Sequence, residues 1–331
     1  MRIAVVFTKR NDMPEHYRLD WEGRNKNDDA EATVKALKKL GHDVFEYEVN
    51  LGLFERLRAN KDNIELVFNL CDDGFFGKAE LEPHLPAMLD VLKMPYTGGD
   101  YFTLAVTLKK ETAKKILTSY GLPTPKFQVF ENGSESIEKL NFPLIVKPAH
   151  EDGSIGVRES SIVYDVSSLK KMINHVIKEY KQPALAEEFI DGREFNVAII
   201  GDGEILPINE IMFDLPEGKP KIISYEAKWK EGSIEYNGTK RSCPAVLDEK
   251  LAMQLRTLAM KAGSLFGCRD YFRVDFRVDK NNNPFILEVN QNPDISEDDG
   301  GLYEMAKAKG YSYAEMIGKI VESALKNNNI K

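Results

Sequence analysis

Short apolar runs alternate with amphipathic segments along the first hundred residues. The run 3–7 (IAVVF) has the composition of a buried parallel strand. Segment 28–42 has an acidic start, helical spacing of its apolar residues and a glycine stop, which predicts a helix. The alternation predicts a doubly wound α/β sheet. The remaining elements expected in this region are a helix at 79–93 and strands at 43–49, 64–70 and 94–98.

Beyond residue 102 the pattern changes to long helices and strands that return on themselves, which indicates α+β parts. Helices are predicted at 103–119, 167–180, 247–267 and 312–326. Strands are predicted at 142–149, 184–190, 194–200, 206–211, 272–278 and 284–290. A chain of this length exceeds the usual size of one domain. We therefore expect three parts, at 1–102, 103–185 and 186–331.

The last predicted hairpin carries an apolar face and a polar face. Side chains alternate between the two faces of a strand. In FRVDFRV the apolar residues therefore share one face, and the other face holds Arg273, Asp275 and Arg277. In the return strand, Glu288 and Asn290 are two positions apart and share a face as well. The polar face predicts either a binding site or a solvated surface.

The expected register of this hairpin brings two acids together. With a loop at 280–283, Asp275 lies opposite Glu288, and Arg273 lies opposite Asn290. Directly opposed side chains are about 5 Å apart at Cβ. Two carboxylates at that separation repel, and a bound cation removes the cost; carboxylate and amide oxygens suit Mg²⁺. The alternative is a solvated face on which the arginines pair with the acids, and the spacing alone leaves both open.

Composition narrows the class of ligand. Hydrophobic residues are 42% and charged residues 30%, with a formal net charge of -8, as in a globular protein without the basic surface that nucleic acid requires. The three cysteines, Cys71, Cys243 and Cys268, are widely spaced and predict neither a disulfide framework nor a zinc site. No apolar run is long enough for a signal peptide or a membrane span, so a cytoplasmic protein without membrane contact is expected.

Several basic and glycine residues fit a phosphate ligand. Lys147 ends an apolar strand before a proline, where a lysine either extends to solvent or faces an anion. The following loop, HEDGSIGV, contains Gly153 and Gly156, which let backbone N–H groups turn toward phosphate. The loop lacks the ending of a Walker A motif, and no GxGxxG follows the first strand. Lys109 and Lys228 add charge, while Glu187 and Glu194 are either nucleotide-binding acids or surface acids.

In order along the chain, these segments resemble the ATP-grasp superfamily, and within it the D-alanine–D-alanine ligase group. The order is Lys109, IVKPA with its glycine–serine loop, EEFIDGREF, YEAK, FRVDF and EVNQNP. The resemblance covers nearly all of the chain. It implies an N-terminal doubly wound pre-ATP-grasp domain, a central ATP-grasp subdomain with the phosphate loop, and a C-terminal subdomain with the metal site.

The resemblance also implies roles for individual residues. It assigns the nucleotide to Lys109, Lys147, Gly153, Ser154, Glu187, Glu188, Phe189, Ile190, Glu194 and Lys228. It assigns one or two Mg²⁺ ions, or Mn²⁺ in their place, to Asp275, Glu288 and Asn290. Arg273 matches the arginine that stabilises the tetrahedral intermediate, and Lys228 and Ser154 join it as catalytic residues.

The implied activity is an ATP-dependent carboxylate–amine ligase that forms an amide through an acyl phosphate. The substrate walls depart from the family. The candidates there are Glu15, Asp20 and Glu22 in the long first loop, with Trp229, Asp294 and Ser296 further on. A ligase for small amino-acid-like substrates is therefore expected. D-alanine–D-alanine ligase itself, and a regulatory ATP-binding protein without catalysis, stay open, as does a homodimer.

Overall fold

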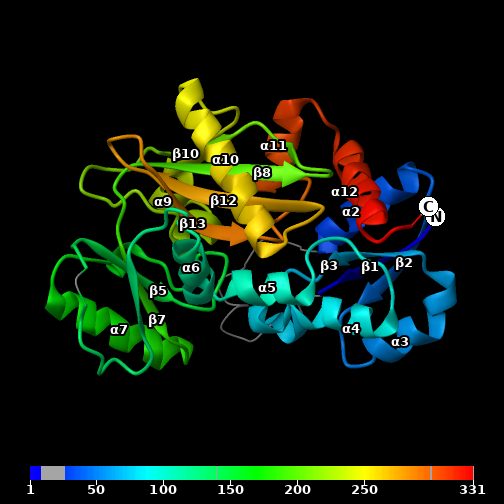
Figure 1. Cartoon of the computed structure of the whole chain (residues 1–331), viewed down its shortest axis with the longest axis horizontal. Helices are drawn as coiled ribbons and strands as arrows, with labels where there is room; N and C mark the ends of the chain where they lie inside the picture. The colour runs from blue at the N-terminus through cyan, green and yellow to red at the C-terminus, as the bar shows by residue number, and fades with distance from the viewer. Residues whose placement is uncertain (9–26, 139, 299, 331) are drawn as a thin grey trace.

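Three β-sheets with their helices build the molecule (Figure 1). The structure is a computed structural model, and it describes residues 1–8, 27–138, 140–298 and 300–330. The sheets follow one another along the chain, so each is formed by one stretch of sequence. The predicted mixture of α/β and α+β parts is confirmed.

The first sheet is parallel and has the strand order β2-β1-β3. Its strands are β1 (Arg2–Phe7), β2 (Asp43–Glu48) and β3 (Leu66–Leu70). The helices around it are α2 (Asn27–Lys39), α3 (Leu53–Asn60) and α4 (His84–Leu92). The 3₁₀ turns are η2 (Lys61–Asn63), η3 (Phe75–Gly77) and η4 (Ala79–Leu81). The prediction of a strand at 94–98 is wrong, because only Tyr96 pairs there, in a single bridge to Val67.

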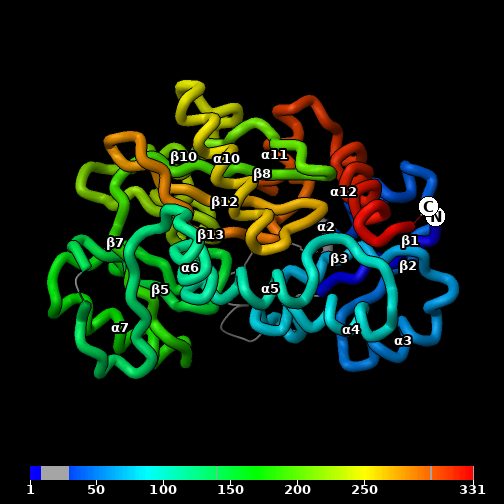
Figure 2. The backbone as a smooth tube through the Cα atoms, viewed as in Figure 1, coloured from blue at the N-terminus to red at the C-terminus, as the bar shows by residue number. Residues whose placement is uncertain are grey.

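The helix expected at 103–119 is two helices, α5 (Tyr101–Leu108) and α6 (Lys110–Ser119). They break at Lys109, whose ψ of 88° is not helical. Figure 2 shows this segment running from the side of the first sheet toward the last hairpin, and both helices contact β13 (Pro284–Asn290). The break decides which lysine begins α6 beside that hairpin.

The second sheet is antiparallel, with the order β4-β7-β5-β6 and helix α7 (Val166–Tyr180) packed against it. Its strands are β4 (Phe127–Phe130), β5 (Leu144–Pro148), β6 (Ile162–Val163) and β7 (Ala184–Glu188). A 3₁₀ turn, η5 (Glu159–Ser161), precedes β6. The sheet extends past residue 185, where a domain boundary was expected. The division into three parts stays a prediction.

The third sheet has the order β11-β10-β8-β12-β13, and β9 pairs with β8. Its other strands are β8 (Arg193–Ile200), β9 (Glu204–Ile205), β10 (Asn209–Phe213), β11 (Thr239–Ser242) and β12 (Tyr271–Val278). The helices of this region are α8 (Tyr225–Trp229), α9 (Ile234–Gly238), α10 (Glu249–Phe266), α11 (Gly301–Lys309) and α12 (Tyr313–Asn327). Pro284 opens β13 as predicted, and α11 was not predicted.

Helix α12 joins the chain's two ends in one core. Ile317 and Ile320 are fully buried in the same apolar cluster as Ile3 and Val5 of β1. Burial of each such side chain stabilises the fold by about 1.5–3 kcal/mol. The first and third sheets are thereby packed together. Among the helices of the described residues, none combines the length and apolarity that a membrane crossing needs.

Candidate active site

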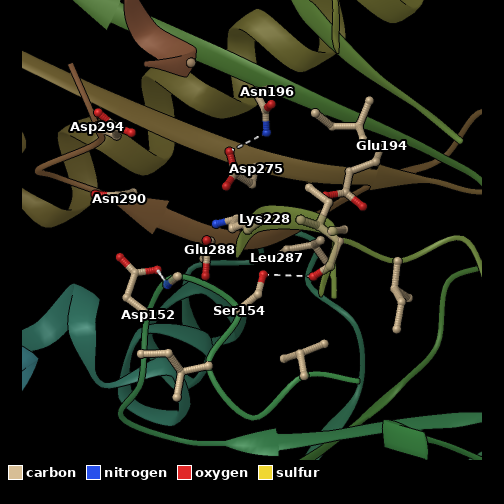
Figure 3. A pocket seen from close by; sticks show the side chains of 18 of the residues that line it. Asp152, Ser154, Glu194, Asn196, Lys228, Asp275, Leu287, Glu288, Asn290 and Asp294 are labelled. Atoms are coloured by element: carbon tan, nitrogen blue, oxygen red, sulfur yellow. Dashed lines mark hydrogen bonds between the residues drawn. The ribbon is translucent and has the colours of Figure 1, made fainter. Parts of the chain in front are cut away.

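All three sheets contribute to one large cavity of about 1050 Å³. The second sheet supplies Lys147 and the loop after β5, and the third sheet supplies the hairpin β12–β13. Residues after β3 line another part of the wall, including Asp72 and Asp73. Figure 3 shows Asp275, Glu288, Lys228 and Ser154 around this space.

The hairpin has the register predicted for its chemistry. Asp275 pairs with Glu288, and Arg273 pairs with Asn290. Nearer the loop Phe276 pairs with Ile286, so the register shifts at a β-bulge. The loop is one residue longer than expected, because Val278 rather than Asp279 pairs with Pro284. Without the bulge, Glu288 would turn to the opposite face and leave the cavity.

Arg273 and Asp275 form a two-pronged ion pair on β12. The Arg273 Nε and Nη2 atoms donate to the two Asp275 oxygens at 2.7 and 2.8 Å. The Asn196 amide, on the neighbouring strand β8, donates to Asp275 Oδ1 at 2.7 Å. Burial raises the pKa of Asp275, and Arg273 opposes that rise. The ion pair of the alternative reading is therefore present, but inside a cavity rather than on a solvated face.

Glu288 pairs with Lys110, not with an arginine of the hairpin. The Lys110 Nζ donates to Glu288 Oε2 at 3.0 Å. Burial alone would raise the pKa of Glu288, but Lys110, Lys147 and Lys228 hold it below its usual range. Glu288 is therefore an anion at neutral pH. Figure 3 shows the Lys228 ammonium beside it.

Lys110, and not Lys109, lies at the cavity position that the sequence prediction gave to Lys109. Lys109 is exposed at the break between α5 and α6 and is not among the cavity residues, whereas Lys110 lines the cavity. The sequence does not separate the two lysines, because Lys109 and Lys110 precede Ala113 by four and three positions. Such positions share a helix face.

Glu187 lies between two lysines. Its carboxylate is 2.6 Å from Lys114 Nζ and 2.7 Å from Lys147 Nζ, with side chains 1%, 1% and 12% exposed for Glu187, Lys114 and Lys147. Burial lowers the pKa of Lys114 to about 8 despite Glu187. Burial would raise the pKa of Glu187, yet the two lysines hold it below its ordinary value. The sequence analysis did not identify Lys114, because a lysine within a helix usually lies on the surface.

The segment after β7 forms the cavity wall expected to hold a nucleotide base. Glu188, Phe189 and Ile190 all line it. The Phe189 N–H donates to the Pro143 carbonyl at 3.0 Å. Glu188 accepts from Asn141 at 2.7 Å, so its carboxylate is anchored at the edge of the second sheet.

Glu194 on β8 lines the part of the cavity wall that the third sheet forms. Its carboxylate is 2.8 Å from Arg277 Nη2, and both side chains are buried. Burial raises the pKa of Glu194, and Arg277 opposes the rise. Arg277 thus pairs with Glu194 and not with Glu288. The acid is fixed in place by a cation that also donates to the Gly192 carbonyl at 3.0 Å.

The glycine–serine loop after β5 is attached to the α8 region. The Ser154 hydroxyl donates to the Ile223 carbonyl at 2.8 Å, and the Trp229 indole N–H donates to the Gly153 carbonyl at 2.8 Å. Gly153 and Ser154 have φ values of 61° and 62°. A β-carbon at Gly156 would lie 2.5 Å from a Pro148 carbon, so this turn requires glycine. Trp229 therefore supplies a hydrogen bond that attaches the loop to α8.

Replacing Trp229 by Phe removes the indole donor and keeps an aromatic ring. One hydrogen bond between neutral groups contributes about 1 kcal/mol, so we expect the KM for ATP to rise roughly 5-fold. The thermal unfolding temperature should change little. Steady-state kinetics at varied ATP concentration measures the effect. An unchanged KM would show that this bond does not hold the loop over the nucleotide.

The remaining substrate candidates lie at the far end of the cavity. Asp294 and Ser296 line it, and Asp294 Oδ1 accepts from the Ser296 N–H at 2.8 Å and hydroxyl at 2.7 Å. Asn292, which follows the hairpin, donates to the buried Glu82 at 2.8 Å. The candidates of the first loop lie outside the described residues: Glu15, Asp20 and Glu22.

The hairpin residues fit a divalent cation. Asp275, Glu288 and Asn290 offer carboxylate and amide oxygens at one edge of the cavity, the donor set that Mg²⁺ prefers. Among the described residues there is no group of three or more His, Cys, Asp or Glu side chains that could hold a metal ion. A cation at the hairpin would therefore complete its shell with water or phosphate oxygens, as Mg²⁺ usually does.

Comparison with solved structures gives the fold class. The crystal structure of D-alanine–D-alanine ligase from Bacillus anthracis complexed with ATP has a TM-score of 0.76, with 23% identity over 99% of both chains. A second crystal structure of the same ligase has a TM-score of 0.77. The chain therefore has the ATP-grasp fold of this ligase.

Sequence comparison gives the family. The model of the "D-ala D-ala ligase C-terminus" matches residues 116–322. D-alanine–D-alanine ligase of Aquifex aeolicus is 32% identical over 88% of this chain and 92% of its own. "Uncharacterized protein y4sG" of Sinorhizobium fredii is 34% identical over 89% of this chain and 87% of its own. The chain belongs to the D-alanine–D-alanine ligase family, which makes it an ATP-dependent ligase that forms C–N bonds, and the predicted resemblance is confirmed.

Proposed function

We propose that this ligase joins two small amino-acid-like substrates through an acyl phosphate, with release of ADP and phosphate. The observation that carries the proposal is the convergence of Lys110, Lys147 and Lys228 on the edge where Asp275 and Glu288 face each other. Both steps gather negative charge on oxygen atoms, and fixed cations in a partly desolvated cavity stabilise such charge most effectively.

The residues divide along the cavity by chemistry. Lys110 and Lys147 face the phosphate groups of ATP, and the Ile190 backbone and Glu194 face adenine and ribose. Gly153 and Ser154 cover the phosphates, since their loop is tied to Ile223 and Trp229. Arg273 faces the carbonyl oxygen that becomes negative when the amine attacks. Positioning of the substrates supplies much of the remaining rate enhancement.

Asp275, Glu288 and Asn290 would hold Mg²⁺, which supplies charge neutralisation on the phosphate oxygens when bound. Asp275 and Glu288 each pair with a cation of the chain, whereas the Asn290 amide oxygen accepts from the Asn292 N–H at 2.9 Å. Lys110 holds Glu288 ionised, and Arg273 together with Asn196 orients Asp275. The chain itself therefore sets the protonation and direction of both acids before any ligand arrives.

An ATP-dependent phosphate-release screen tests the proposal. Purified protein with ATP and MgCl₂ is supplied with pairs of amino acids from a panel of L- and D-enantiomers, including D-alanine with itself. We expect phosphate release that depends on particular pairs, and mass spectrometry should find the corresponding dipeptide. Turnover with D-alanine alone would identify D-alanyl-D-alanine synthesis. ATP binding without turnover on the full panel would contradict the proposed reaction.

The adjacent lysines at the start of α6 offer a matched pair of variants. A hydrogen bond to a charged group contributes about 1.5–3 kcal/mol, so Lys110→Ala should raise the KM for ATP roughly 10- to 100-fold. Lys109→Ala should leave it unchanged, because that side chain is exposed outside the cavity. Kinetics at varied ATP concentration, with thermal unfolding as a folding check, compares them. Equal effects of the two substitutions would contradict the assignment of Lys110.

A further inference from the structure

The part of the cavity wall that holds Asp294 and Ser296 also contains an arginine, and the proposed function gives this arginine no role. Arg241 lies on β11 and lines the cavity together with Asp294, Ser296 and Glu304. Its side chain is 41% exposed, and its guanidinium is 3.6 Å from the Glu304 carboxylate. Ion pairs this open to solvent contribute about 0–1 kcal/mol to stability.

Arg241 and Arg273 approach the same space at Gly301. A β-carbon on Gly301 would lie 3.7 Å from Arg241 Nε and 3.8 Å from Arg273 Nη1. The turn before it is fixed, because a β-carbon on Gly300 would lie 2.4 Å from the Ser296 carbonyl oxygen. Glycine at 301, the first residue of α11, thus leaves the gap between two guanidinium groups without a side chain. The gap opens into the cavity, since Gly301 is one of its lining residues.

One α-amino acid at Gly301 can reach both guanidinium groups. The amine nitrogen and the carboxylate carbon of an α-amino acid are separated by two bonds, or about 2.5 Å. If Arg273 faces the reacting carbonyl, the attacking amine must lie near Arg273. The carboxylate of that amine substrate then lies within reach of the neighbouring cation, which is Arg241. A planar guanidinium binds a carboxylate with two parallel hydrogen bonds.

We propose that Arg241 binds the carboxylate of the amine substrate and is a specificity-determining residue of this ligase. The inference rests on the proposed function, because it needs the amine to attack beside Arg273. Arg241 makes the enzyme select acceptors that carry a free carboxylate over the corresponding amides. The Arg241 guanidinium is 3.6 Å from the Glu304 carboxylate, longer than a hydrogen bond, so a substrate carboxylate can bind it more closely than Glu304 does.

Three kinds of acceptor separate this role from the formation of the acyl phosphate. Hydroxylamine traps an acyl phosphate as a hydroxamate and carries no carboxylate. D- and L-alanine carry one, and D- and L-alaninamide are their uncharged counterparts. Each acceptor is supplied with ATP, MgCl₂ and the donor amino acids that release phosphate with the wild type. The measured quantities are the acceptor KM, kcat and the rate of hydroxamate formation.

For Arg241→Gln we expect the KM for alanine to rise roughly 10- to 100-fold, the effect of losing a charge-assisted pair. Hydroxamate formation and the KM for alaninamide should stay within about 2-fold of the wild type. Gly301→Val, which fills the gap and keeps both arginines, should raise the KM for alanine as well. Arg256→Gln, on the exposed surface of α10, is the matched control and should change nothing.

The outcomes distinguish this inference from the reaction on which it rests. No hydroxamate from the wild-type enzyme would contradict the ligase reaction and, with it, the role of Arg241. Hydroxamate from the wild type, with an unchanged KM for alanine in Arg241→Gln, would overturn the inference alone. A parallel loss of hydroxamate formation in Arg241→Gln would also overturn it, because the residue would then serve the first step or the fold.

Discussion

Replacing Arg273 by Ala should lower kcat roughly 10²- to 10³-fold while most of the affinity for ATP survives. The comparison is with the loss of one donor to an oxyanion in other enzymes. In the proposed mechanism, Arg273 faces the reacting carbonyl, whereas Lys110 and Lys147 face the phosphates. The substitution also removes the two hydrogen bonds at 2.7 and 2.8 Å that orient Asp275. Steady-state kinetics together with ATP binding by calorimetry measures both quantities.

Two further variants separate charge from geometry at this position. Arg273→Lys keeps the positive charge but cannot hold a carboxylate with two parallel bonds, so we expect it to recover only part of the activity. Arg256→Ala, an exposed arginine on α10, is the control for loss of an arginine elsewhere. Near-normal turnover in Arg273→Ala would contradict the assigned role. A loss of ATP affinity as large as the loss of kcat would contradict it too.

Asp275→Asn and Glu288→Gln should each reduce ligation below detection. Each removes one of the two carboxylates that face each other across the hairpin, and an amide holds Mg²⁺ far less strongly than a carboxylate does. The expected signature besides activity is a lost dependence of ATP affinity on MgCl₂. Titration of ATP at several MgCl₂ concentrations measures that dependence directly.

The control for this pair is Glu249→Gln, which changes an exposed acid at the start of α10. It should leave both activity and the Mg²⁺ dependence intact. Full activity of Glu288→Gln at a high MgCl₂ concentration would show that Glu288 contributes less to Mg²⁺ binding than proposed. Retained Mg²⁺ dependence in both cavity variants would contradict the proposed metal site.

The hairpin could be predicted from sequence because strand alternation is strict. Two side chains two positions apart must share a face, so the pairing of Asp275 with Glu288 required only a nearly correct loop. The loop prediction was one residue too short, and the bulge at the Leu287 position restored the register. The bulge therefore cancelled the one-residue error in the predicted loop. Strand alternation alone does not predict a bulge.

The lysines were harder to assign, because a helix break has no strong sequence signal here. LKKETAKK contains neither glycine nor proline, so Lys109 and Lys110 look equivalent. The non-helical ψ of Lys109 separates them, and α6, which begins at Lys110, contacts β13. Lys114 and Arg241 were missed for a related reason. Their contacts are with residues distant in the sequence, Glu187 and Glu304, which no local pattern contains.

The fate of the substrate oxygen tests the proposed chemistry most directly. The protein is supplied with ATP, MgCl₂ and a mixture of L- and D-amino acids whose carboxylates carry ¹⁸O, and the released phosphate is analysed by mass spectrometry. If the carboxylate attacks the terminal phosphate, each phosphate molecule leaves with one atom of ¹⁸O. Phosphate that is released without the label would show that water, not a substrate carboxylate, accepts the phosphoryl group, and the ligase account would fail.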